Sequence, residues 1–323
     1  MINRVVIFAA CVLVCAVSAP AAHAEWPDHA IHWVVPFGPG GANDLIARVA
    51  AEAVSKRLGQ SIIIDNRPGA GAIVGTGAVA RAPADGYTFL IGAAGVITNS
   101  MLMKNLPYAD SDLVPVGMIA VAPSTIVVNP SVPANNMAEF VAWAKAQGEK
   151  GITWSTAGSG STPHFVAEMI KEATGANLTI VPYRSGSDGV NAVLSNSVSA
   201  TSEASIVVLP QIKAGLLKAI ATTYVKRISA YPSLMTTAEQ GFPTVQIGHW
   251  AGLLAPRGTP EPIIQRMNAE MQAAIKTSDV QDKLAASGIE SAGGSVADFV
   301  AFITTERQRL GALAAKAKMS AEQ

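Results

Sequence analysis

The sequence predicts an α/β protein of two lobes joined by two crossing strands, with a ligand cleft between the lobes. Short apolar strands alternate with helices along residues 31–95 and again along 152–222, a pattern typical of mainly parallel sheets. A proline-punctuated passage at 123–133 and an apolar stretch at 247–256 carry the chain between these regions and back. We therefore expect a signal peptide at 1–24, a first lobe at 25–126 and 249–323, and a second lobe at 127–248.

The opening unit spans residues 31–58. β-branched and aromatic residues predict a strand up to residue 37, and the glycines of the turn at 38–41 let the backbone bend sharply. Apolar residues at helical spacing follow, and Asn43 or Asp44 is the expected N-cap. A glycine-rich turn that opens a helix presents free N–H groups at the positive end of the helix dipole, so this turn is a candidate anion site. A tight turn without a ligand is the alternative.

The rest of the first lobe continues the alternation. We expect a strand at 61–64, a helix at 73–81, and a strand at 88–91 that ends in a second small-residue turn at 92–95. In parallel sheets, ligands bind beyond the carboxyl ends of the strands. The turns at 38–41 and 92–95 should therefore lie together at that edge.

The second lobe repeats the strand–turn–helix arrangement. A strand at 152–155 leads into a Gly/Ser-rich turn at 156–164, in which Ser161 or Thr162 can cap the next helix and Pro163 suits its first position. This lobe therefore has an anion-binding turn of its own. The remaining expected strands lie at 114–120, 125–128, 179–183, 198–203 and 217–222. Helices are expected at 137–147, 207–214 and 280–286. Three further helices are expected, of which one ends at residue 194, one begins at residue 260 and one begins at residue 295.

Residues 1–24 have the features of a secretory signal. Arg4 precedes an apolar run that is too short to span a bilayer, and the Ala-His-Ala at 22–24 fits a cleavage site. We expect cleavage after Ala24 and export to the periplasm. Both cysteines lie in this segment, so the mature chain has no disulfide, thiol nucleophile or thiolate metal site.

Composition and motifs exclude several function classes. The chain has 23 Lys plus Arg and 23 Asp plus Glu residues, so nucleic acid is not an expected partner. No serine-hydrolase elbow, His-Glu-x-x-His motif or phosphate loop occurs, and the histidines lack metal-ligand spacing. We therefore expect a binding protein without a cofactor or metal rather than an enzyme. The enzyme alternative is a periplasmic hydrolase or lyase that uses Ser161 and His164.

Several short motifs lie in order along the chain. They are Trp-Pro at 26–27, Val-Pro-Phe-Gly-Pro-Gly-Gly at 35–41 with Asp44, Asn-Arg-Pro-Gly-Ala-Gly at 66–71, Ala-Asp-Gly-Tyr-Thr at 84–88, Leu-Pro-Tyr at 106–108, Val-Asn-Pro at 128–130, Val-Pro-Tyr at 181–183, Lys-Ala-Gly at 213–215 and Gly-Leu-Leu-Ala-Pro at 252–256. Together they resemble the Bug-type solute receptors of the tripartite tricarboxylate transporter family.

The resemblance implies a periplasmic binding protein fold of type II. It implies a cleft that captures a small organic carboxylate, either a di- or tricarboxylate or an aromatic carboxylate. It also implies delivery of this ligand to the membrane subunits of a tripartite tricarboxylate transporter. The alternative is a ligand-loaded signalling receptor that docks on a membrane sensor. We expect a monomer.

The family's binding loops are matched by residues of both lobes. Carried over from the resemblance, the expected ligand-binding residues are Phe37, Gly40, Gly41, Asn43, Asp44, Ala93, Ala94, Ser155, Gly158, Ser161, Thr162, His164 and Glu203. Gly95, Arg184 and Asp188 complete the expected set. The expected mechanism is that N–H groups of the turns at 38–44 and 155–164 converge on a carboxylate, partly through ordered water. Glu203 stands where the family usually has aspartate.

Other roles stay open for some of these positions. Asp44 can serve only as a helix cap, and His164 only as a helix-surface residue. Arg184 and Arg257 are candidate cations for a second carboxylate, and a solvated surface position is the alternative for each. Trp250 can pack in the hinge or stack on the ligand.

Overall fold

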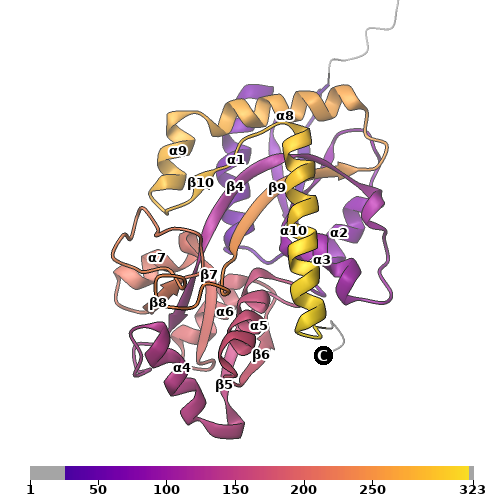
Figure 1. Ribbon diagram of the computed structural model, residues 1–323. Helices are drawn as coiled ribbons and strands as arrows, with labels where there is room; N and C mark the ends of the chain where they lie inside the picture. Colours follow the sequence, from indigo (N-terminus) through magenta and orange to yellow (C-terminus); the bar gives the residue numbers. More distant parts are fainter. Residues whose placement is uncertain (1–25, 320–323) are drawn as a thin grey trace, which may run out of the picture.

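The computed structural model describes residues 26–319. The signal peptide expected at 1–24, with its cleavage after Ala24, lies outside these residues. Figure 1 shows two lobes along the long axis of the molecule, with strands β4 (Leu113–Val128) and β9 (Gly248–Pro256) running between them. The architecture is the two-lobed α/β fold that the sequence predicts.

The helices and strands alternate along most of the chain. The other strands are β1 (Ile31–Val35), β2 (Ile62–Asn66), β3 (Thr88–Gly92), β5 (Ile152–Thr156), β6 (Leu178–Pro182), β7 (Ala200–Ala204), β8 (Lys218–Thr222) and β10 (Glu290–Ser291). The helices are α1 (Ala42–Leu58), α2 (Ile73–Ala80), α3 (Ala94–Leu102), α4 (Met137–Ala146), α5 (Thr162–Thr174), α6 (Gly186–Leu194), α7 (Ser205–Lys213), α8 (Glu261–Ile275), α9 (Ser278–Ala285) and α10 (Val296–Lys316). Of these, α3 and β10 have no counterpart among the elements expected from the sequence.

The first lobe is built on the strand order β2-β1-β3-β9. Strand β1 is parallel to β2 and β3, and β9 is antiparallel to β3. Trp33 and Phe89 are fully buried in the core of this lobe. Because three consecutive strands run parallel here, their carboxyl ends lie at one edge of the sheet, as expected.

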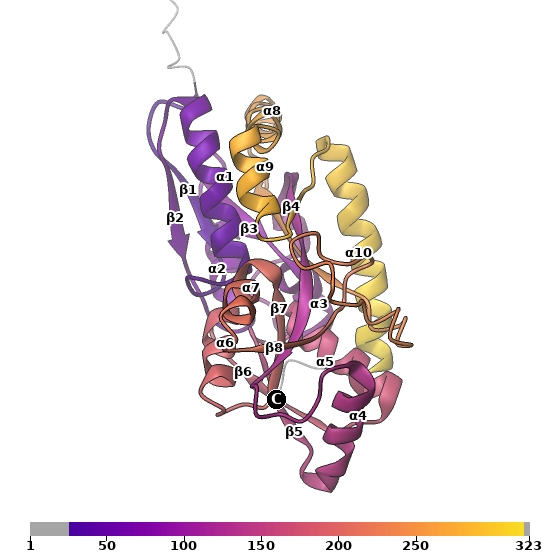
Figure 2. The ribbon, with the colours of Figure 1, turned by 90° about the vertical axis from the view of Figure 1, so that its left-hand side faces the viewer.

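Helices α8 and α10 cover opposite faces of the β4–β9 pair, as Figure 2 shows with the sheet seen from its side. A Cβ atom on Gly117 of β4 would meet Met271 of α8, whereas a Cβ atom on Gly252 of β9 would meet Phe299 of α10. Glycine at these two positions therefore lets both helices pack closely on the strands.

The second lobe continues the same sheet in the order β4-β7-β5-β6. Strand β5 is parallel to β6 and β7, while β7 and β8 are antiparallel to β4. Phe140, Trp154 and Phe165 are fully buried in its core. The prediction of a mainly parallel sheet is thus correct for the outer strands of each lobe and wrong at the centre, where β4 and β9 run antiparallel to their neighbours.

Strand β4 corrects the expectation of separate strands at 114–120 and 125–128. It is continuous, pairing with β9 as far as Pro123 opposite Gly248 and with β7 from Ser124 onward. Proline has no N–H group to donate to a ladder, and Pro123 lies where β4 changes partners. The residue boundaries of the lobes stay a prediction, and this change of partners lies close to one of them.

Helix α10 packs against both lobes. Phe299, near its start, belongs to the core of the first lobe, whereas Leu310 and Ala314 belong to the core of the second. Along the way the helix contacts α3, β4 and α5. The C-terminal helix therefore forms a connection between the lobes in addition to the two strands.

Candidate functional site

A small cavity lies where the N-termini of four helices meet. It has a volume of about 30 Å³, room for only a few water molecules. Its lining residues are Phe37, Gly41, Ala42, Asn43, Ala93, Ala94, Gly95, Ala157, Ser161, Thr162, Pro163, Gly186, Glu203 and His249. These include the first residues of α1 and α3 from the first lobe and of α5 and α6 from the second. Because helix N-termini carry partial positive charge, their convergence forms an anion site.

Three of these four helices begin without a side-chain cap. Gly41, Ala93 and Ser161 occupy the N-cap positions of α1, α3 and α5, and none of their side chains accepts a hydrogen bond from the first turn. In α6, by contrast, the Ser185 side chain accepts from the Asp188 N–H. The first N–H groups of an uncapped helix take their partners from outside the helix. Since no Lys or Arg is among the described residues that line the cavity, backbone groups supply its positive potential.

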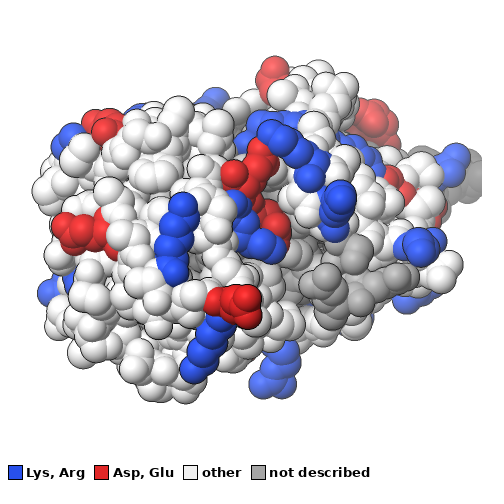
Figure 3. Space-filling model, turned by 60° about the horizontal axis from the view of Figure 1, so that its bottom comes forward, with Lys and Arg blue, Asp and Glu red and all other residues white. Residues whose placement is uncertain are grey.

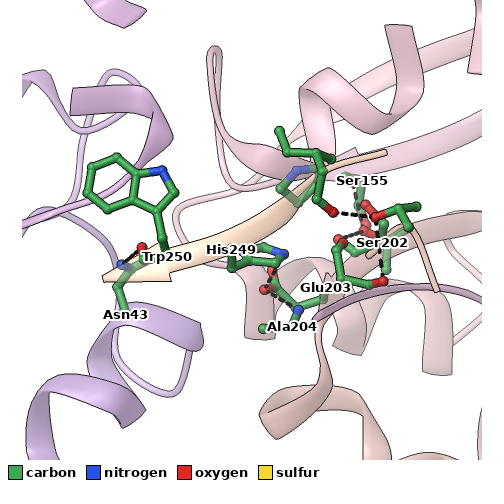
Figure 4. Close-up of polar contacts among 12 residues, drawn as sticks. Asn43, Ser155, Ser202, Glu203, Ala204, His249 and Trp250 are labelled. Carbon is green, nitrogen blue, oxygen red and sulfur yellow. Dashed lines mark hydrogen bonds and ion pairs between the residues drawn. The ribbon is translucent and has the colours of Figure 1, made fainter. Parts of the chain in front are cut away.

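Asn43 holds the start of α1 in place instead of capping it. Its side-chain Nδ2 donates to the carbonyl of Trp250 at 2.9 Å and to that of Gly92 at 3.4 Å, as Figure 4 shows for the Trp250 contact. The prediction of an N-cap at Asn43 or Asp44 is therefore wrong, because Gly41 is the N-cap and both side chains have partners elsewhere. Asn43 joins three elements, α1, β3 and β9, at the cavity wall.

Asp44 lies behind the turn and not on the cavity. Its carboxylate accepts hydrogen bonds from the Gly40 N–H at 2.9 Å, from Asn66 Nδ2 at 3.0 Å and from the Arg48 guanidinium. Burial raises the pKa of this carboxyl, but the hydrogen bonds from Arg48, Gly40 and Asn66 outweigh it and hold the pKa below its ordinary value. Asp44 is thus ionised, paired and fixed as a support for the turn at 38–41. Gly40 donates its backbone N–H to this carboxylate and lines neither the cavity nor the groove beside it.

The second-lobe turn is supported in a similar way. The Ser161 hydroxyl donates to the Gly158 carbonyl at 2.6 Å, and His164 Nδ1 accepts from the Gly160 N–H at 3.2 Å. The Ser155 hydroxyl donates to the Gly189 carbonyl at 3.1 Å. Ser155 and His164 therefore shape the turns from behind, while Ser161 also lines the cavity. The predicted N-cap position at Ser161 is correct, although its side chain bonds to the turn instead of to the helix.

A wider groove of about 980 Å³ opens beside the cavity and shares Phe37 and Ala157 with it. Gly158, Arg184 and Asp188 line this groove instead of the cavity. Arg184 is the only Lys or Arg among its described lining residues. The predicted ligand residues therefore divide into a cavity group, a groove group and the supporting group of Gly40, Asp44, Ser155 and His164.

Glu203 and His249 form the only part of the cavity wall with ionisable side chains, among the residues described. Both are almost fully buried, and His249 Nε2 lies 3.4 Å from Glu203 Oε1 (Figure 4). Burial raises the pKa of Glu203 to about 7, against an opposing hydrogen bond from the Ala204 N–H, and burial lowers the pKa of His249 to about 3. His249 is therefore neutral at pH 7, and the contact is not an ion pair.

His249 is the functional candidate that reasoning from the sequence misses. It is the one ionisable side chain in the apolar strand Gly248–Pro256. A buried polar residue needs a hydrogen-bond partner, so its position in this strand could have indicated a functional role. Gly186, Ala42, Ala157 and Pro163 also line the cavity without having been predicted as ligand residues. They contribute backbone or small apolar surface, and such positions have no recognisable motif in the sequence.

Comparison with known proteins identifies the family. Residues 46–319 match the model of the tripartite tricarboxylate transporter family receptor. The chain belongs to this family. It is similar to the protein BugT of Bordetella pertussis, with 33% identity over 297 residues that cover 91% of this chain and 90% of BugT.

Two solved structures of similar proteins contain a bound dicarboxylate. The Rpa4515 protein of R. palustris with adipate has 32% identity and a TM-score of 0.88, covering 92% of this chain and 99% of its own. MatC of Rhodopseudomonas palustris with bound malate has 27% identity and a TM-score of 0.85, covering 89% of this chain and 99% of its own. The expected Bug-type receptor and the two-lobed periplasmic binding fold are thus confirmed.

As a tripartite tricarboxylate transporter receptor, the chain is a solute-binding protein and not an enzyme. The arrangement of Ser161 and His164 agrees with this, since each is bonded to a backbone group of the turn and not to the other. Within residues 26–319, no three His, Cys, Asp or Glu side chains are grouped so that they could hold a metal ion. The hydrolase or lyase alternative is therefore set aside.

Receptors of this family are periplasmic. In the described part of the chain, none of the helices combines the length and the apolar character needed to cross a membrane. On the face shown in Figure 3, several Lys and Arg side chains lie around Asp and Glu side chains at the upper right, and the rest of the surface is mostly uncharged. This face therefore has no continuous basic patch of the kind that binds nucleic acid.

The structure also places Trp250 and Arg257, two of the residues whose roles the sequence left open. Trp250 is buried and packs its ring against Phe299 and Phe302 of α10, with ring centroids 6.0 and 5.4 Å away. Arg257 is exposed at the far end of β9, where its backbone N–H donates to the Asp112 carbonyl. Neither side chain lines the cavity or the groove.

Proposed function

We propose that this receptor binds a small dicarboxylate between its lobes and delivers it to the membrane subunits of a tripartite tricarboxylate transporter. The observation that carries the proposal is the convergence of four helix N-termini, three of them without a side-chain cap, on one cavity whose described lining includes no Lys or Arg. Such a site favours a carboxylate over neutral or cationic solutes. The adipate and malate in the similar structures support a ligand with two carboxylates.

The backbone groups are sufficient for useful affinity. A hydrogen bond to a charged group contributes about 1.5–3 kcal/mol, so three or four N–H groups give about 5–12 kcal/mol before ordering costs. Micromolar binding corresponds to about 8 kcal/mol. No cationic side chain is therefore needed to hold one carboxylate at this position.

Ligand entry requires the lobes to move apart, because a cavity of about 30 Å³ is smaller than any dicarboxylate. We place the hinge at β4 and β9, between a first lobe of 25–126 and 249–323 and a second lobe of 127–248. The protein would act as a monomer in the periplasm, after cleavage following Ala24. Closure around the ligand would then bring the helix N-termini of both lobes onto it.

A thermal-shift screen of residues 25–323, freed of co-purified ligand, tests this function. The panel contains adipate, malate, citrate, an aromatic diacid, and sugars as neutral controls. A ligand at 100 times its Kd adds about 2.7 kcal/mol of stability, which gives a clear shift of the melting temperature. We expect a shift with one or more dicarboxylates and none with the sugars. Absence of a shift with every carboxylate would refute the proposal.

A further inference from the structure

The Glu203–His249 end of the cavity has hydrogen-bonding capacity that the protein does not use. His249 Nε2 is fully buried and has no hydrogen-bond partner within residues 26–319. Glu203 Oε1 accepts from the Ala204 N–H at 2.8 Å, whereas Oε2 makes no hydrogen bond to any residue described. Thr125 stands directly opposite Glu203 on β4, and its hydroxyl also lacks a partner. Buried polar groups normally have partners, so the open positions of Glu203 and His249, both in the cavity wall, point to a ligand.

The Glu203 carboxyl is held closely against the start of α6. A Cβ atom on Gly186 would overlap Glu203 Oε2, so only glycine leaves room for the carboxyl at this place. Both residues line the cavity. The carboxyl group is therefore part of the ligand site and cannot swing toward α6.

Within residues 26–319, no Lys or Arg side chain lines the cavity beside Glu203 to balance a negative charge. Strands β4 and β5 contain no titratable residue, and β9 contributes only neutral His249. The charged groups of the surrounding helices face elsewhere. Asp188 of α6 lines the groove, and Lys213 of α7 is exposed. In α5, His164, Glu168 and Lys171 contact one another, and in α1 Asp44 is paired with Arg48. A buried carboxylate without a counter-charge is unstable, and a second anion in the cavity would make it more so.

We propose that Glu203 binds the ligand in its protonated form, with its O–H donated to a ligand carboxylate, so that a receptor in which Glu203 is ionised takes up one proton from the solvent when a dicarboxylate binds. This inference rests on the proposed function and specifies which side chain of the second lobe binds a ligand carboxylate. His249 stays neutral beside the acid. The rise of the pKa of Glu203 to about 7 in the empty receptor is in the direction that the proposal needs.

An ammonium-bearing ligand is the competing possibility, in which ionised Glu203 would pair with the ammonium. The geometry disfavours it because the positive ends of α1, α3, α5 and α6 surround the same cavity and would repel a cation. Malate and aspartate form a matched pair of probes, since they differ only in a hydroxyl and an ammonium group. We expect malate to bind at least tenfold more tightly than aspartate.

The pH dependence follows from linkage. At about pH 6 most of the free receptor already carries the proton, so binding takes up little proton from the solvent. Above the free-receptor pKa of about 7, the proton must be taken up on binding, and Kd rises by up to tenfold per pH unit. Between about pH 6 and about pH 8 we expect adipate and malate to lose about tenfold in affinity.

Isothermal titration calorimetry in two buffers of different ionisation enthalpy measures both Kd and proton uptake. For wild type at about pH 8 we expect close to one proton taken up per adipate or malate. Glu203→Gln keeps a neutral donor, so it should bind with the affinity of wild type at low pH, take up no proton and lose the pH dependence. Glu168→Gln, which changes a buried carboxyl outside the cavity, is the matched control and should behave as wild type.

The outcomes separate the two proposals. If no carboxylate binds wild type at any pH, the proposed function fails. If dicarboxylates bind with no proton uptake and a Kd independent of pH, the function stands and the protonated Glu203 is overturned. Tight aspartate binding that Glu203→Gln abolishes would also overturn it, in favour of an ammonium partner.

Discussion

The backbone N–H of Gly38 donates a hydrogen bond of 3.0 Å to the carbonyl of Arg184, and this bond joins the loop before α1 to the loop before α6. Beside it, the Ser187 hydroxyl donates to the Pro39 carbonyl at 2.9 Å. Both bonds cross between the lobes, and neither uses a charged group. Since a neutral hydrogen bond contributes about 0.5–1.5 kcal/mol, closure at this edge is easily reversed.

Ser187→Ala should weaken ligand binding by about 2- to 10-fold, because it removes one of the bonds that favour the closed arrangement. Ser187 lines neither the cavity nor the groove, so a direct effect on ligand contacts is not expected. Titration calorimetry measures Kd, and small-angle scattering measures the accompanying rise in radius of gyration. Ser131→Ala, which removes an exposed hydroxyl within the second lobe, should change neither quantity. An unaltered Kd for Ser187→Ala would show that this bond does not contribute to closure.

Ala42→Pro should reduce dicarboxylate affinity by about 10- to 100-fold, the effect of losing one hydrogen bond to a charged group. Ala42 is the first residue of α1 and lines the cavity. Proline is well tolerated at this helix position, and the extended backbone of Gly41 (φ −78°, ψ 171°) suits a residue before proline.

Val296→Pro is the matched control for this substitution. Val296 is the first residue of α10, it follows extended Ser295, and it lies outside the cavity. Both variants should melt near the wild-type temperature, and only Ala42→Pro should bind weakly. Equal affinity of the two variants would exclude the N–H of residue 42 as a ligand donor.

Asp44→Ala should lower the free energy of unfolding by about 1–3 kcal/mol at pH 7, because it leaves buried partners such as the Gly40 N–H unsatisfied. The pKa of Asp44 in the folded protein lies below its ordinary value of 3.8. The stabilisation is therefore complete above that value and is lost as the pH falls through the lower pKa of the folded state. Urea denaturation should show a difference in the free energy of unfolding between wild type and variant that becomes smaller as the pH is lowered. The control is Asp282→Ala, at an exposed position. Its free energy of unfolding should stay within about 0.5 kcal/mol of the wild-type value at every pH.

Gly186→Ala should destabilise the fold by about 1–3 kcal/mol, because the new methyl group overlaps the Glu203 carboxyl. Glu203→Ala removes the overlapping group, so the double variant should be more stable than the sum of the single effects predicts. Denaturant unfolding of the four proteins gives this coupling directly. Additive effects would show that the two residues do not touch in solution.

Local signals in the sequence predict the turns of the site well. The glycines at 38–41, the small residues at 92–95 and the Gly/Ser run at 156–164 each follow a strand and open a helix, and all three contribute to one cavity. Such turns are recognisable because the backbone conformation itself demands these residue types. Gly40, for example, has a φ of +78°, which favours glycine.

Roles that depend on distant partners are not predictable in this way. Asp44 has the position of a helix cap, but its role is decided by Asn66 on the next strand. His249 becomes a cavity residue only because β9 returns between β3 and β4, some 200 residues after the first strand. The continuity of β4 through Pro123 likewise follows from the strands available on either side. Pairing between remote strands leaves no local pattern in the sequence.

The position of α10 sets an energetic cost on opening. A molecule joined by two strands alone could swing freely about them, but this helix has buried side chains in the cores of both lobes. To widen the entrance, the protein must either pull the last turns of α10 off α5 or lift the whole helix from α3 and β4. Exposing one leucine such as Leu310 already costs about 1.5–3 kcal/mol. Opening of the entrance should therefore cost free energy at α10 as well as at the two strands.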